Sequence, residues 1–144
     1  MKRLRIISLL FILILLSACS NGNNVTSLRI KNELLNIEIS ADELSRTKGL
    51  SGRESLGENW GMIFIFEEEA KHNFWMKDMN FPLDILYIKN DEIVEIFKNV
   101  KILDNYGEFT EIFPKEKADK VLELNAGWCD IHDVRVGDKI EYPY

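Results

Sequence analysis

The chain has 144 residues, of which 18 are basic and 24 acidic, so its formal net charge is −6 at neutral pH. A chain of this length has room for about one hydrophobic core, and its acidic balance argues against nucleic acid and anionic headgroups as partners.

The N-terminal 18 residues have the order of a secretory signal. Three basic residues precede an aliphatic run over 6–16, and the small residues Ser17 and Ala18 lead to Cys19. The apolar run is about half of the roughly 20 residues that a membrane-spanning helix needs. The end of the segment resembles a bacterial lipobox, which implies cleavage before Cys19 and a lipid on its sulfur. We therefore expect a lipoprotein signal peptide over 1–18.

A lipid on Cys19 predicts the location and one partner of the protein. The chain would lie in the cell envelope on the extracytoplasmic face, anchored to the membrane by its N-terminal lipid. Residues 19–27 are short and polar, which predicts a flexible tether, and residues 28–144 would form a single domain.

Cleavage and lipid attachment would also change the net charge and the number of free thiols. Loss of Lys2, Arg3 and Arg5 leaves 15 basic and 24 acidic residues, a net charge of −9. Cys129 then has no partner for an internal disulfide, and we expect it to be a small buried hydrophobic side chain.

Most of the predicted domain has the pattern of short strands. Alternating polar and apolar residues predict a half-buried strand over 35–39, and residues 61–66 are apolar on both faces, which indicates a central strand. We expect Phe64 and Trp75 to be buried. Further strands are predicted over 28–31, 72–77, 83–88, 92–100, 119–124 and 139–142, with a tight hairpin at 90–91 and an irregular connection over 101–117.

Two short helices complete the prediction. Ser40 and Glu43 fit a capping box with Ser40 as the N-cap, so a helix should run to about Lys48 and end at Gly49. Asn125 is the expected cap of a second helix over 126–132. The fold class is thus α+β and dominated by β-structure: about seven mainly antiparallel strands in a strongly curved sheet or partly open barrel, with two short helices.

Five blocks carry a family resemblance. They are KGLSGR at 48–53, GMIFIF at 61–66, FWMKDM at 74–79, PLDIL at 82–86 and VLELNAG at 121–127. In this order they resemble the DUF192 family, small bacterial and archaeal proteins of unknown function, over about residues 35–142. The resemblance implies a compact β-rich fold with a small helical part, often behind a signal peptide, and no established catalytic activity. Cys129 is not part of the family's pattern.

A candidate polar pocket follows from charges placed among apolar residues. Asp84 lies in the apolar run 83–88, so its carboxylate needs a partner if it is buried. Lys77 and Arg53 are the natural partners, and Glu123 lies in a strand that should join the same sheet. We take Arg53, Lys77, Asp84 and Glu123 as the candidate polar pocket. The structural alternative is a charged network that closes one end of the barrel.

His72, Met76 and Met79 are candidate ligands of a metal site, since thioether and imidazole groups can bind Cu(I). Residues 72 and 76 share a strand face but 79 points away, so core packing explains both methionines better. Paired-cysteine and nucleotide-binding motifs are missing from the sequence. We expect no metal and no cofactor.

Two classes of function remain open. The first is a membrane-anchored extracytoplasmic accessory or binding module, whose pocket or edge holds a small polar ligand or an envelope protein. The alternative is an envelope hydrolase that uses Asp84 and Glu123 as an acid–base pair. Two carboxyl groups within about 5–10 Å in an open cleft would suit hydrolysis of a glycosidic type, whereas sealed carboxylates suit binding or architecture.

Overall fold

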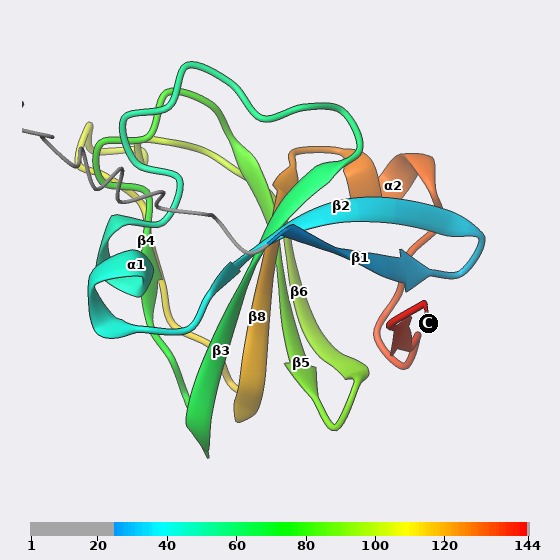
Figure 1. Cartoon of the computed structure of the whole chain (residues 1–144). Coiled ribbons are helices and arrows are strands. Elements are labelled where there is room, and N and C mark those ends of the chain that lie inside the picture. Colours follow the sequence, from blue (N-terminus) through cyan, green and yellow to red (C-terminus); the bar gives the residue numbers. More distant parts are fainter. Residues whose placement is uncertain (1–24, 144) are drawn as a thin grey trace, which may run out of the picture.

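The computed structural model describes residues 25–143 (Figure 1). The predicted signal peptide, Cys19 and most of the predicted tether lie outside the described residues. The described elements, in chain order, are β1 (Val25–Ile30), β2 (Glu33–Ser40), α1 (Glu43–Lys48), β3 (Trp60–Ala70), β4 (Phe74–Trp75), β5 (Leu83–Lys89), β6 (Glu92–Val100), β7 (Glu111–Ile112), β8 (Ala118–Asn125), α2 (Trp128–Ile131) and β9 (Ile140–Glu141). None of the helices formed by these residues is long and apolar enough to cross a membrane.

Seven strands form one mixed sheet in the order β6-β5-β8-β3-β2-β1-β9. All neighbours are antiparallel except β2 and β3, which are parallel and are connected through α1. The sheet curls into a half-barrel (Figure 1), and its two outer strands meet at one corner, where Glu92 pairs with Lys139. Strands β4 and β7 form a separate two-stranded sheet. The predicted fold class is confirmed.

The curled sheet separates two hydrophobic cores. The first contains Leu28 of β1, Ile93 of β6 and Ile140 of β9, so it lies inside the curl, between the two edges of the sheet. The second contains Phe64 of β3 and Tyr87 of β5 and lies on the opposite face, where β4, β7 and the loop after α1 cover it. Because the sheet is covered on both faces, its central strands are apolar on both faces. The predicted central strand over 61–66 is thereby confirmed.

The start of α1 differs from the prediction. The N-cap is Asp42, which accepts a hydrogen bond from the Ser45 backbone N–H at 2.9 Å, and Ser45 completes the capping box. Ser40 cannot be the cap because it still belongs to β2, where it pairs with Phe64 of β3. The helix can begin only after the chain has left the sheet.

The segment around Trp75 also differs. The predicted strand over 72–77 is reduced to two residues, Phe74 and Trp75. These residues pair with β7, which lies inside the segment 101–117 that the sequence predicts to be irregular. Asp78 then turns the chain with a positive φ of 57°. Trp75 is 48% exposed because β4 lies outside the main sheet, so the expectation of a buried Trp75 is wrong.

Two element boundaries are also corrected. β1 begins at Val25, inside the segment predicted as a tether. Asn125 does not cap α2: it belongs to β8, and its side-chain amide donates to the carbonyl oxygens of Leu56 and Gly57. Gly127, which adopts a positive φ of 83°, occupies the N-cap position of α2.

Candidate functional site

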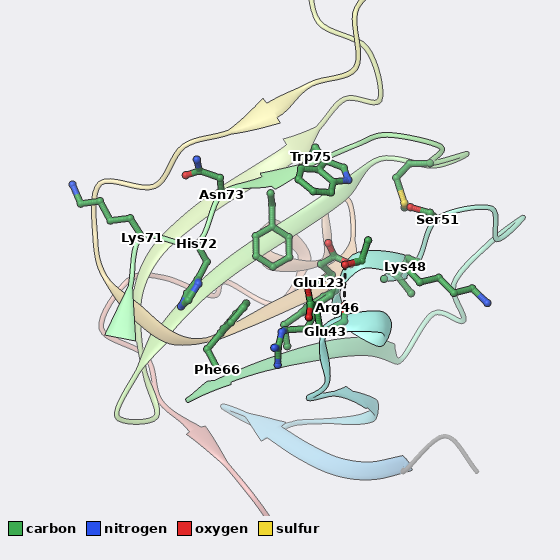
Figure 2. Close-up of a pocket in the computed structure, with 16 residues that line it drawn as sticks. Glu43, Arg46, Lys48, Ser51, Phe66, Lys71, His72, Asn73, Trp75 and Glu123 are labelled. Atoms are coloured by element: carbon green, nitrogen blue, oxygen red, sulfur yellow. Dashed lines mark hydrogen bonds between the residues drawn. The ribbon is translucent and has the colours of Figure 1, made fainter. Parts of the chain in front are cut away.

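A cavity of about 380 Å³ opens beside the second core, between α1, β3 and the segment that contains β4 (Figure 2). We call it the aromatic cavity. Its apolar walls are formed by Leu50, Phe64, Phe66, Phe74, Trp75 and Met79. Charged and polar side chains lie among these walls, and Glu123 of β8 is one of them. A mostly apolar concave site with a few polar groups is the usual form of a small-ligand pocket.

The aromatic walls are held by edge-to-face contacts. The ring of Phe74 meets Phe64 at a centroid distance of 5.0 Å and an interplanar angle of 89°, and it meets Phe66 at 6.5 Å and 83°. Such pairs add stabilisation beyond the area that they bury. The wall is therefore built into the fold before any ligand arrives, and the half-exposed Trp75 stands at its open side.

The ring of Phe66 contacts a histidine and an arginine side chain. His72 stacks on it at 3.5 Å with an interplanar angle of 10°, and the Arg46 guanidinium lies over the ring at 5.3 Å. Arg46 also donates to the carbonyl oxygens of Ala41 and Ile65, which fixes its position. Burial lowers the pKa of His72, with a smaller effect of the nearby Arg46, so the imidazole is neutral around pH 7.

Glu123 is the unusual group of the cavity. It is 5% exposed, and its Oε2 atom has no hydrogen-bond partner among the described residues. Its place in β8, opposite Met62 of β3 and Ile85 of β5, puts it on the second-core face. Burial raises the pKa of Glu123 to about 8, against a weaker lowering by Arg53. The carboxyl group is therefore protonated at neutral pH and able to donate a hydrogen bond.

Arg53 is held beside this face by an ion pair that the sequence analysis missed. Its guanidinium donates to both oxygens of Glu38, at 2.6 and 2.8 Å, and this hydrogen bonding lowers the pKa of Glu38. Glu38 pairs with Met62, which pairs with Glu123, so both acids share one face of the sheet. The alternating pattern of β2 suggested a solvent-facing Glu38. Glu38 is buried because other segments of the chain, including the loop that carries Arg53, cover the second face of the sheet.

Asp84 lies on the other face of the sheet. It pairs with Leu124, whereas its neighbour Ile85 pairs with Glu123, and successive strand residues point to opposite faces. Its oxygens accept three backbone N–H groups, from Asn99 at 2.7 Å, Gly127 at 3.2 Å and Cys129 at 2.8 Å. The expected ion pair with Lys77 or Arg53 is therefore wrong, because backbone donors compensate the buried carboxylate.

Lys77 is exposed, and within the described part of the chain it contributes its carbonyl oxygen to a hydrogen bond from Ser51 rather than an ion pair. Of the four candidate residues, the structure brings Arg53 and Glu123 to one face and leaves Asp84 and Lys77 apart from them. Two carboxyl groups on opposite faces of a sheet cannot flank one scissile bond. The arrangement contradicts the predicted Asp84–Glu123 acid–base pair.

Residues 25–143 contain no group of three His, Cys, Asp or Glu side chains placed to hold a metal ion. Met76 and Met79 are buried in the second core, where packing accounts for both. Cys129 is a buried free thiol in the first core, and burial raises its pKa. Its predicted burial is confirmed, and the raised pKa suits an inert side chain.

The curled sheet and the aromatic cavity define a small barrel-like protein with a pocket beside its second core. The chain belongs to the DUF192 family, described as Uncharacterized ACR, COG1430, whose family model matches residues 26–142. The predicted resemblance is confirmed.

Two solved structures share the fold. A protein from Sinorhizobium meliloti 1021 with the provisional description of a transcription regulator has a TM-score of 0.75 and 31% identity, over 82% of this chain and 93% of that one. A protein of unknown function from Novosphingobium aromaticivorans DSM 12444 has a TM-score of 0.74 and 26% identity, over 86% of this chain and 89% of that one. No curated protein matches the chain.

Proposed function

We propose that the protein is a membrane-anchored extracytoplasmic binding module and that the aromatic cavity holds its ligand. One observation carries the proposal: Glu123 is buried in the cavity lining with its Oε2 atom unpaired among residues 25–143. Leaving a buried polar group without a partner costs about 1–3 kcal/mol. A ligand that hydrogen-bonds to Glu123 would remove that cost.

The neighbouring charges support binding rather than catalysis. Glu38 is engaged by both donors of Arg53, and Asp84 is engaged by three backbone N–H groups behind the sheet. Neither Glu38 nor Asp84 is therefore free to act with Glu123 as an acid–base pair, and the other acid of the described lining, Glu43, is an exposed rim residue. A group that binds and orients a ligand needs no such partner.

The anchor is supported by the leader. Cys19 follows a segment that resembles a lipobox, and β1 begins at Val25. The five residues between them can span at most about 20 Å. A lipid on Cys19 would thus hold the domain, and with it the aromatic cavity, close to the membrane surface. The acidic charge of the chain argues against nucleic acid as the partner.

The experiment isolates the full-length protein from its own cells and identifies the small molecules that co-purify with it. Trp75→Ala removes a half-exposed wall of the cavity, and Tyr106→Ala removes an exposed aromatic side chain that does not line it. We expect wild type and Tyr106→Ala to carry the same molecule and Trp75→Ala to lose it, with similar melting temperatures. If no molecule depends on Trp75, the aromatic cavity is not the ligand site.

A further inference from the structure

The lining of the aromatic cavity is basic although the chain is acidic. Arg46, Lys48 and Lys71 line it together with two acids, Glu43 at the rim and the buried Glu123, whereas the whole chain has 24 acidic and 18 basic residues. Figure 2 shows Lys48 and Lys71 on opposite sides of the pocket, with their ammonium ends directed away from it, and Arg46 between them. The guanidinium of Arg46 lies over the Phe66 wall, and positive charge at a cleft attracts anions and repels cations. The opening therefore favours a ligand with a negative group.

The aromatic walls favour a flat apolar body next to that group. Phe74 is fixed by its edge-to-face contacts, and the neighbouring Trp75 ring is half exposed. A planar ring placed against Trp75 would bury apolar surface that water now covers, and aromatic rings contribute specific stacking geometry in addition.

The buried end of the cavity needs an acceptor. Glu123 is protonated at neutral pH because burial raises its pKa to about 8. A protonated carboxyl group donates through its O–H, and Oε2 has no acceptor among the described residues. An ether, carbonyl or hydroxyl oxygen on the ligand would complete this hydrogen bond.

We propose, on the basis of the binding function above, that the aromatic cavity takes a small organic acid with a flat apolar body. Its ring lies against Phe74 and Trp75, an acceptor oxygen at its inner end receives the hydrogen bond from Glu123, and its carboxylate at the outer end lies near Arg46. The three contacts use the three kinds of group that line the cavity.

A cationic ligand is the competing occupant, since aromatic walls and a carboxylate also suit an ammonium group. That ligand would need Glu123 ionised and would meet the basic opening. The two ligand classes therefore require opposite protonation states of Glu123. The acid should bind more weakly as the pH rises through about 8, and the amine should bind more tightly.

Within residues 25–143, the charged and titratable groups around Glu123 come from five segments. They are Glu38 of β2, Glu43, Arg46 and Lys48 of α1, Arg53 of the following loop, Lys71 and His72 before β4, and Tyr87 of β5. Burial lowers the pKa of His72 and raises that of Tyr87, so neither changes charge between pH 7 and 9. Glu123 is the group expected to titrate in that interval.

The test titrates the full-length protein in non-ionic detergent with two probes, 4-methoxyphenylacetate and 4-methoxyphenethylamine. They share the ring and the ether oxygen and differ in charge, and both keep their charges between about pH 6 and 9. We expect the acid to bind at least about tenfold more tightly than the amine at pH 7 and to lose about tenfold in affinity between pH 7 and 9.

Two variants assign the pH dependence. Glu123→Gln keeps a donor that cannot ionise, so it should remove the pH dependence and bind the acid about tenfold more tightly than wild type at pH 9. Glu43→Gln should keep the wild-type slope, because Glu43 is an exposed rim residue. A thermal melt checks that both variants fold.

Tighter binding of the amine, with affinity that rises with pH, would overturn the organic-acid assignment, as would the absence of binding by either probe. Neither outcome touches the binding function itself, which is judged by the molecule that co-purifies in a Trp75-dependent manner. The wild-type pH profiles of the two probes decide the question even if a variant does not fold.

Discussion

Glu123 lowers the stability of the fold that buries it. Burial raises its pKa from 4.5 to about 8, so the folded chain keeps a proton that the unfolded chain releases. Stability is therefore fully present below about pH 4.5, falls as the pH rises, and levels off above about pH 8. Burial of a residue that reduces stability at neutral pH is better explained by a role in binding than by a role in packing.

Replacing Glu123 by Gln should stabilise the protein at neutral pH. The amide keeps the shape and cannot ionise, so the gain should be near zero at pH 4 and about 3 kcal/mol at pH 7. Denaturant unfolding at several pH values measures this difference. Glu54→Gln, at an exposed position, is the control and should show no such pH dependence. A gain for Glu123→Gln that is equal at pH 4 and pH 7 would mean that Glu123 is ionised in the fold.

For single residues, the sequence indicates which side chains of one strand share a face. It does not indicate how neighbouring strands pair. The alternation of side chains along a strand places Asp84 on the same face as Leu86 and Ile88, and the latter two lie together in the first core. The relation of Asp84 to Glu123 depends on the register between β5 and β8, where Asp84 meets Leu124. A shift of one residue would exchange the faces, and no local pattern in either strand determines that register.

At the scale of elements, Asp84 joins three segments. Its carboxylate receives N–H groups from Asn99 in β6, from Gly127 at the N-cap of α2 and from Cys129 inside α2. Asn99 has a positive φ of 53° where the register between β5 and β6 shifts. The short helix and the irregular pairing thus share one buried acceptor.

Asp84→Asn should destabilise the fold by about 3 kcal/mol, because hydrogen bonds to a charged group are worth about 1.5–3 kcal/mol and the new amide places a donor against backbone donors. Asp130→Asn is the matched control in α2. Asp130 pairs with Lys98 at 2.7 Å on the surface, where water screens the charges, so loss of this ion pair should cost much less than loss of the Asp84 carboxylate. Denaturant melts compare the two variants, and equal losses would contradict the role of Asp84 as the shared acceptor.

The second core should tolerate loss of Trp75 far better than loss of Phe64. Phe64 is 2% exposed in the central strand β3, and Phe64→Ala should cost about 3–5 kcal/mol. Trp75 lies half exposed on β4, so Trp75→Ala should cost much less. Comparable losses in thermal and denaturant melts would show that β4 is part of the core rather than a wall of the cavity.

The elements that the sequence predicted well are those specified locally. Asn90 and Asp91 both adopt positive φ and form the expected tight turn between β5 and β6. Strand β4, by contrast, consists of two residues and exists because Phe74 pairs with Ile112. Such a pairing across a long stretch of sequence leaves no periodic signal in either segment, so the prediction gave a longer strand and an irregular loop.

For the whole molecule, the two cores have different roles. The first core fills the curl and is sealed by α2, whereas the second lies under the aromatic cavity and the segments that line it. Sequence composition predicted that the chain could close a core, but the division into two cores follows from the curl of the sheet. The aromatic cavity and the first core are therefore on opposite sides of the same strands.

A lipid on Cys19 would hold the whole molecule at the membrane. Cys19→Ser should block lipid attachment, so the protein should remain unprocessed or be released from the membrane. Cys129→Ala is the control, because its thiol is buried in the fold and should leave anchoring unchanged. Cell fractionation combined with mass spectrometry of the N-terminus distinguishes processed, lipidated and unprocessed chains. A Cys19→Ser protein that is cleaved normally and still stays in the wash-resistant membrane fraction would exclude the lipid anchor and would leave the aromatic cavity to be explained in a protein held by other means.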